Sequence, residues 1–154
     1  SLRASRSKSY RPLDGTFSGM FSFSARASCQ QAGTSTGVFM LTQVLPAQFT
    51  QWLASHAANG ITPVVLDVRE PWEIAQASIK PGEGYELRCI PMHEIPGRLQ
   101  ELDPDHPIAC LCHHGARSMS VAAFLVNHSF EDVSNITGGI DAWSLSADPS
   151  VPRY

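Results

Sequence analysis

A cysteine, two histidines and an arginine lie together in the stretch CHHGAR at residues 112–117. A short apolar run that begins at Ile108 ends in Cys112, and an amphipathic segment begins near Ser118. This order predicts a strand, a turn that contains glycine, and a helix, with Cys112 at the bend. A cysteine in this position is a candidate nucleophile, because the thiolate is the reactive form of the side chain.

The start of the predicted helix offers an anion-binding site beside Cys112. The N–H groups of a helix's first turn have no partner within the helix, and the helix dipole adds partial positive charge there. The same field favours a thiolate over a thiol. Arg117 lies at the end of the loop, where its planar guanidinium can bind an anion through two hydrogen bonds. We therefore expect a cradle for an anion with a thiol inside it.

The number of residues between the cysteine and the arginine bears on the reaction. Tyrosine-phosphatase-like enzymes have five residues between these two positions, whereas only the four residues His113 to Ala116 separate Cys112 from Arg117. A shorter loop makes a tighter ring of N–H groups. We interpret this ring as better suited to a sulfur-centred group on the cysteine than to a tetrahedral phosphate. A phosphatase or an arsenate reductase is therefore the weaker alternative.

Composition is that of a globular protein with one domain. The chain has 154 residues, of which 43% are hydrophobic and 16% charged, and this length supports a sizeable core. No window approaches the ~20 consecutive apolar residues of a transmembrane helix. The four cysteines show no disulfide-framework spacing, which favours a reducing compartment. We expect a cytoplasmic protein that binds neither membrane nor nucleic acid.

The first 38 residues differ from the rest of the chain. They are rich in Ser, Arg and Gly, and they hold five basic residues and one acid, a net charge of +4, which leaves −7 for residues 39–154. We predict that residues 1–38 are a disordered leader or tail. Three origins stay open: a sequence that is not part of the natural protein, with a start near Met40; an organelle transit peptide; and an export signal. The second and third would change the compartment.

Apolar runs and helical periods alternate along residues 39–154. Residues Val64 to Val68 form an almost wholly apolar run, which is typical of a strand buried on both faces in a parallel sheet. The pattern predicts an α/β domain of about five mostly parallel strands with helices on both faces. Ligands of such sheets bind beyond the carboxyl ends of the strands, where Cys112, Asp67 and Arg69 are expected to lie. The predicted strands are 42–45, 64–68, 85–90, 108–112 and 133–137. Helices are predicted from Pro46 to Asn59-Gly60, from a start at Glu70 to Glu73, at Ile95, Leu99 and Leu102, from near Ser118, and over Ile140 to Leu145.

From residue 40 to about 146 the sequence resembles a single-domain rhodanese. The features that carry this resemblance are, in order, LDVRE at 66–70, IP at 90–91, CHHGARS at 112–118 and GGIDAW at 138–143. The resemblance implies a rhodanese-like domain over residues 39–154 and sulfurtransferase chemistry, with a persulfide on Cys112. It also implies that the backbone of His113 to Arg117 forms the cradle, with Asp67 and Arg69 beside it.

The expected reaction has two steps. The Cys112 thiolate attacks the outer sulfur of a donor such as thiosulfate and sulfite leaves; a thiol, which a protein can supply, or cyanide then takes the sulfur from the persulfide. No metal or other cofactor is required. A persulfide carrier, or a regulatory rhodanese module without efficient turnover, is the non-catalytic alternative. The residues assigned to substrate binding are His113, His114, Gly115, Ala116, Arg117 and Ser118.

Several neighbouring residues have competing interpretations. The two histidines tune the charge of the loop or line its mouth; a zinc site is disfavoured because C-x-C-H-H lacks the usual ligand spacing. Ser118 is either a contact or a helix cap. Asp67 and Arg69 are expected to support the loop through hydrogen bonds. Four other residues are predicted to lie in the core: Cys89, Cys110, Trp72 and Trp143; His128 is placed on the core-facing stripe of the helix that follows Ser118.

Overall fold

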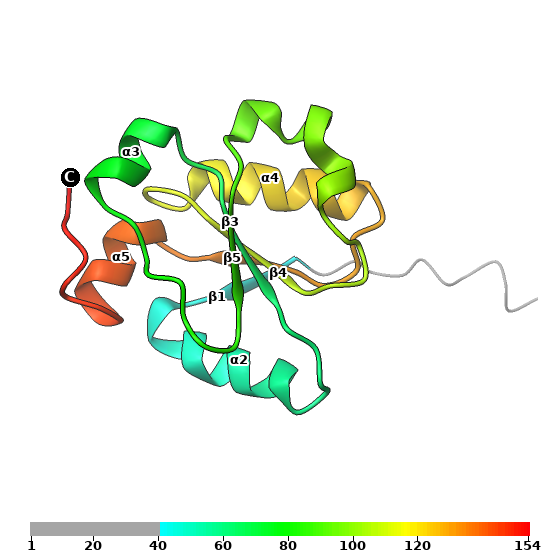
Figure 1. The fold of residues 1–154 in the computed structure, drawn as a ribbon, viewed down its shortest axis with the longest axis horizontal. Coiled ribbons are helices and arrows are strands. Elements are labelled where there is room, and N and C mark those ends of the chain that lie inside the picture. The colour runs from blue at the N-terminus through cyan, green and yellow to red at the C-terminus, as the bar shows by residue number, and fades with distance from the viewer. Residues whose placement is uncertain (1–40) are drawn as a thin grey trace, which may run out of the picture. The chain divides into compact units, whose positions relative to one another are not determined.

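The computed structural model describes residues 41–154 (Figure 1). The predictions of disorder and of targeting for residues 1–38 lie outside these residues and stay predictions. Within residues 41–154 no helix is both long enough and apolar enough to cross a membrane.

Five parallel strands form one sheet, in the order β1-β5-β4-β2-β3. The prediction of about five mostly parallel strands is confirmed, and every strand pair in the sheet is parallel. β4, which leads into the Cys112 loop, lies between β5 and β2 and is buried along its whole length. The strands are β1 (Thr42–Val44), β2 (Val64–Asp67), β3 (Glu86–Cys89), β4 (Ile108–Leu111) and β5 (Val133–Ile136).

Helices cover both faces of the sheet, as predicted (Figure 1). On one face α2 (Phe49–Ala57) and α5 (Gly139–Ser146) pack on alternate residues of the central strands. On the other face α4 (Ala116–Asn127) packs on the intervening residues, together with two 3-10 segments. The remaining elements are η1 (Pro46–Gln48), α3 (Pro71–Gln76), η2 (Met92–Glu94) and η3 (Pro96–Glu101).

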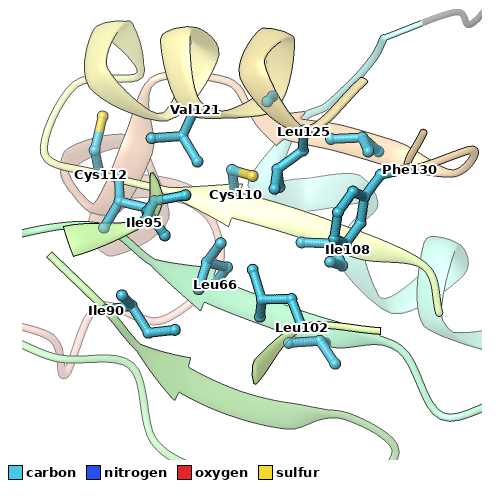
Figure 2. Packing of buried hydrophobic residues seen from close by; sticks show 14 residues of the cluster. Leu66, Ile90, Ile95, Leu102, Ile108, Cys110, Cys112, Val121, Leu125 and Phe130 are labelled. Carbon is cyan, nitrogen blue, oxygen red and sulfur yellow. The ribbon is translucent and has the colours of Figure 1, made fainter. Parts of the chain in front are cut away.

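Two cysteines of one strand face differ in their surroundings. Cys110 and Cys112 are two residues apart, so the alternation of an extended chain turns both toward α4 (Figure 2). The side chain of Cys110 projects from β4 toward the α4 residues Val121 and Leu125, and it has no exposed surface. Burial raises the pKa of the Cys110 thiol, which therefore stays protonated. The prediction that Cys110 is a core residue is confirmed.

The helix predicted around Ile95, Leu99 and Leu102 is wrong in type. The structure has two short 3-10 segments there, and Arg98 has non-helical dihedral angles (φ −120°, ψ 17°). The pair Pro96-Gly97 explains the difference, since proline suits only a first turn and glycine weakens helix propagation. The three predicted apolar residues still pack against the core, so the periodicity identified the buried face correctly.

Three predicted core positions are also wrong. Trp72 is 60% exposed, because α3 turns the carboxylate of Glu73 inward instead of the indole. Cys89 is exposed at the end of the edge strand β3. His128 is exposed at the C-terminus of α4, where its Nδ1 contacts the carbonyl oxygen of Phe124 at 2.7 Å. The other predicted core tryptophan, Trp143, is buried.

Candidate active site

The Cys112 loop begins where β4 ends and closes on the first turn of α4. Cys112 directly follows Leu111 and is only 1% exposed. Gly115 precedes α4 in the left-handed region, at φ 103°, a conformation that glycine adopts at little cost. This turn brings the N–H of Gly115 within 3.1 Å of the Cys112 Sγ atom and the Ser118 hydroxyl within 3.2 Å of it. The sulfur atom therefore faces one backbone N–H group and one hydroxyl group.

The first turn of α5 donates two backbone hydrogen bonds to the Cys112 loop. The N–H of Ile140 donates to the carbonyl oxygen of Cys112 at 2.8 Å, and the N–H of Asp141 donates to that of His113 at 3.1 Å. Gly139 has a φ of 62°, and a Cβ atom there would overlap both carbonyl groups. These bonds occupy the loop's first two carbonyl oxygens and turn them away from Cys112. The GGIDAW motif thus has a direct role in shaping the loop.

A neutral hydrogen-bond network lies on the β5 side of the sulfur. Ser118 is the third residue of α4 and not its N-cap, because α4 begins at Ala116. Its hydroxyl oxygen lies 2.5 Å from Asn135 Oδ1, and Asn135 Nδ2 donates to Gln43 Oε1 at 3.0 Å. Ser118 is fully buried and Asn135 only 4% exposed. The alternative in which Ser118 contacts the reactive sulfur agrees with this geometry.

Arg117 forms an ion pair on the opposite side of the loop. Its two terminal nitrogens lie 2.7 Å from the two carboxylate oxygens of Glu73. Glu73 is buried in α3, and its hydrogen bonds with Arg117 lower the pKa of the carboxyl group to about 2. The carboxylate likewise raises the pKa of Arg117. Glu73 thus holds the Arg117 guanidinium in place and occupies both of its terminal nitrogens.

Asp67 and Arg69 form a second ion pair, which is completely buried. Arg69 Nη2 lies 2.7 Å from Asp67 Oδ2, and Arg69 Nη1 donates to the carbonyl oxygen of Ala77 at 2.8 Å and to the Tyr154 hydroxyl oxygen at 3.0 Å. Burial opposes the charge on Arg69, but Asp67 and Tyr154 outweigh that effect and raise its pKa. The Tyr154 hydroxyl in turn donates to Glu73 Oε1 at 3.0 Å. Tyr154 therefore links the two ion pairs.

The loop histidines belong to a stack of three rings. The His113 ring lies 4.0 Å from the Tyr154 ring at an interplanar angle of 9°, and 3.9 Å from the exposed His114 ring. Arg69 donates a hydrogen bond to Tyr154, whose ring stacks on His113, and the prediction that Asp67 and Arg69 support the loop through hydrogen bonds stays a prediction. Among residues 41–154 no group of three or more His, Cys, Asp or Glu side chains could hold a metal ion.

The structure brings the predicted site residues to one edge of the sheet and adds others to them. The sequence analysis missed Glu73, Asn135, Gln43 and Tyr154. A signal existed for Glu73, which follows Pro71 in the first turn of a predicted helix, where acids commonly cap. No local sequence pattern indicates a role for Gln43, Asn135 or Tyr154, because their roles depend on strand register and on how the chain returns after α5.

Comparisons with known proteins agree with the fold. The family model for the rhodanese-like domain matches residues 49–146. The chain is 43% identical over 94 residues to the chloroplastic rhodanese-like/PpiC domain-containing protein 12 of Arabidopsis thaliana, a match that covers 58% of this chain and 30% of that protein. It is 34% identical over 89 residues to the thiosulfate sulfurtransferase GlpE of Stutzerimonas stutzeri, covering 58% of this chain and 77% of GlpE.

A solved structure shares the architecture. The rhodanese-related protein of Thermoplasma volcanium superposes with a TM-score of 0.57 at 26% sequence identity, over 73% of this chain and 99% of that chain. A rhodanese-like domain protein of Staphylococcus aureus, at 23% identity and a TM-score of 0.57, supports the fold alone. The sheet order, the Cys112 loop and the match over residues 49–146 lead to one conclusion: this chain belongs to the rhodanese-like domain family.

Proposed function

We propose that this protein is a sulfurtransferase that carries sulfane sulfur as a persulfide on Cys112. The observation that supports this most directly is the surroundings of the Cys112 Sγ atom, which faces the Gly115 N–H at 3.1 Å and the Ser118 hydroxyl at 3.2 Å at the N-terminal end of α4. Relatives named thiosulfate sulfurtransferase GlpE add weight to thiosulfate as the donor.

In the first step the Cys112 thiolate attacks the outer sulfur of thiosulfate. A bond forms between the two sulfur atoms, the bond from the outer sulfur to the sulfite sulfur breaks, and sulfite leaves with that bond's electron pair. The persulfide keeps one negative charge on its terminal sulfur. Loop N–H groups and the start of α4 stabilise that charge, because they are already oriented toward the sulfur.

In the second step an acceptor thiolate or cyanide attacks the terminal sulfur. The bond between the two sulfur atoms breaks, and the Cys112 thiolate is the leaving group. The product is an acceptor persulfide or thiocyanate, and no metal or other cofactor enters the balance.

Arg117 contributes to donor binding in a restricted way. Glu73 occupies both terminal nitrogens of Arg117 at 2.7 Å, so the arginine cannot follow a donor as an unpaired side chain would. We propose that the N–H groups of the loop supply most of the contacts to the donor's sulfonate, while Arg117 adds charge from a fixed position. His113 and His114 then line the mouth of the site.

Mass spectrometry of the intact protein tests this function. After incubation with thiosulfate, the wild type should gain the mass of one sulfur atom, and cyanide should remove it. Cys112→Ser should gain none. Cys110→Ala is the matched control, because it removes a thiol two residues away that is buried and protonated, and it should load like the wild type.

The same experiment separates an enzyme from a carrier. Continuous thiocyanate production from thiosulfate and cyanide supports an enzyme, whereas loading without turnover supports the carrier or regulatory alternative. A folded, reduced wild type that gains no sulfur would exclude thiosulfate as the donor. Hydrolysis of p-nitrophenyl phosphate that depends on Cys112 would instead favour the phosphatase alternative.

A further inference from the structure

The Ser118 hydroxyl has one hydrogen and three acceptors within reach. Its oxygen lies 3.2 Å from Cys112 Sγ, 3.2 Å from the carbonyl oxygen of Gly115 and 2.5 Å from Asn135 Oδ1. A hydroxyl group can donate only one hydrogen at a time. The position of that hydrogen therefore determines whether Ser118 offers Cys112 a donor or a lone pair.

The orientation of the Asn135 amide is fixed by groups that can only accept. Asn135 Nδ2 lies 3.4 Å from the carbonyl oxygen of Gly115 and 3.0 Å from Gln43 Oε1. Gln43 is oriented in turn, because its Nε2 lies 3.1 Å from the sulfur of Met119, which has no hydrogen to donate. A flip of the Asn135 amide would place its oxygen against the Gly115 carbonyl oxygen. Oδ1 of Asn135 therefore faces Ser118.

Two oxygen atoms 2.5 Å apart require a hydrogen between them. Since Asn135 Oδ1 is an acceptor, this hydrogen belongs to Ser118, and the lone pairs of the serine are left for Cys112. This arrangement suits a Cys112 thiol, which can donate to Ser118. A negatively charged Cys112 sulfur instead needs the same hydrogen that Asn135 holds.

We propose that Asn135 is a positioning residue that competes with the Cys112 sulfur for the single Ser118 hydrogen. It thereby limits how strongly the loop stabilises negative charge on that sulfur. A thiolate that is less stabilised is intrinsically a stronger nucleophile but is present as a smaller fraction, so the competition sets the balance between these two effects when Cys112 attacks the donor. The inference rests on the proposed role of Cys112, and it adds a residue on β5 whose effect on the Ser118 hydrogen runs through the 2.5 Å contact between Asn135 Oδ1 and Ser118.

Other charged and titratable groups around Cys112 do not depend on Asn135. Arg117 on α4 is close enough to Cys112 for their charges to interact, its partner Glu73 belongs to α3, and Cys110 precedes Cys112 on β4. His113 follows Cys112 in the loop and is held by Tyr154. All of these groups stay in place when Asn135 or Ser118 is replaced, so their effect on the sulfur cancels in a double-mutant comparison.

A double-mutant cycle tests the competition without measuring sulfur transfer. The four proteins are the wild type, Asn135→Ala, Ser118→Ala and the double variant. The measured quantity is the pH midpoint of iodoacetamide alkylation, assigned to Cys112 by peptide fragmentation. In the wild-type background Asn135→Ala should lower the midpoint by about half to one pH unit, the scale of one hydrogen bond. In the Ser118→Ala background it should cause no shift.

Two further variants keep the test independent of packing. Asn135→Leu fills the space of the amide without an acceptor and should lower the midpoint as Asn135→Ala does. Ser118→Thr keeps the hydroxyl and should preserve the Asn135 effect. The proposed competition would be wrong if Asn135→Ala shifted the pH midpoint of alkylation equally in both Ser118 backgrounds. It would also be wrong if neither Asn135 variant shifted the midpoint. Because alkylation needs no sulfur donor, this outcome is distinct from a failure of Cys112 to accept sulfur from thiosulfate.

Discussion

The two sides of the Cys112 loop are held by different chemistry. On the β5 side the contacts are neutral, from the Ser118 hydroxyl through the Asn135 amide to Gln43. On the α3 side they are ionic, and two carboxylate–guanidinium pairs are joined by the Tyr154 hydroxyl. We call these the neutral side and the ionic side; the ionic side consists of Asp67, Arg69, Glu73, Arg117 and Tyr154.

This difference matches what each side has to do during a reaction. The neutral side touches the sulfur, and a hydroxyl hydrogen can change its acceptor when the charge on the sulfur changes. On the ionic side each charged side chain is paired, and removal of Arg69 or Arg117 leaves a buried carboxylate without its partner. The ion pairs of the ionic side therefore make the surroundings of the loop rigid. The hydroxyl group that can change its hydrogen-bond acceptor, that of Ser118, lies next to the Cys112 sulfur.

The largest predicted effect is on the fully buried pair. Arg69→Ala removes the partner of Asp67, which is 1% exposed, and deletes the bonds to Ala77 and Tyr154. We expect a loss of about 3–5 kcal/mol in the free energy of unfolding, measured with urea, because the carboxylate stays buried and uncompensated. Arg69→Ala with Asp67→Asn should recover part of this loss. A loss below about 1 kcal/mol in the single variant would contradict the distinction between the sides.

Acid should weaken the ionic side through Glu73. Its pKa in the folded protein is about 2, below its ordinary value of 4.5. A lowered pKa stabilises the fold above the unfolded value, so this contribution is complete above about pH 5 and is lost as the pH falls from 4.5 toward 2. The expected size is about 3 kcal/mol.

Unfolding in urea at a series of pH values measures this contribution. Glu73→Gln keeps the shape of the side chain but cannot ionise, so its curve should be flatter than the wild-type curve between pH 4.5 and pH 2. Parallel curves for the two proteins would show that Glu73 is not the group responsible.

A smaller effect is expected at the link between the two ion pairs. Tyr154→Phe removes the hydroxyl that accepts from Arg69 and donates to Glu73, but it keeps the ring that stacks on His113. Hydrogen bonds to charged groups contribute about 1.5–3 kcal/mol each, and part of this is regained because the two ion pairs stay intact. We expect a loss of about 2 kcal/mol in urea unfolding, with alkylation of Cys112 little changed.

The sequence predicted the elements that hold Cys112 better than the residues that surround it. The β4 run, Gly115 and the start of α4 are contiguous, so local patterns were sufficient to place Cys112 at a strand end. Three of the surrounding residues are far from Cys112 along the chain: Glu73 by 39 residues, Asn135 by 23 and Tyr154 by 42. They come close to Cys112 only because of the order of the strands and the return of the chain after α5. Trp72 was misplaced for the same reason, because residues distant in sequence determine which face of α3 is buried.

The smallest predicted effect compares two oxygen atoms that each bridge two hydrogen-bond partners, Gln43 Oε1 and the Tyr154 hydroxyl. Gln43 Oε1 accepts from Asn135 at 3.0 Å and from the Thr137 hydroxyl at 3.0 Å, as the Tyr154 hydroxyl bridges two partners on the ionic side. Its partners are neutral and the Gln43 side chain is exposed, so Gln43→Ala should cost only about 0.5–1 kcal/mol in urea unfolding. Because Asn135 then loses a bond that orients its amide, the pH midpoint of Cys112 alkylation should move although stability barely changes. Tyr154→Phe should show the reverse, with a larger loss of stability and little change at the sulfur. Equal losses of stability in the two variants would mean that the ionic side owes its rigidity to packing and not to its charges.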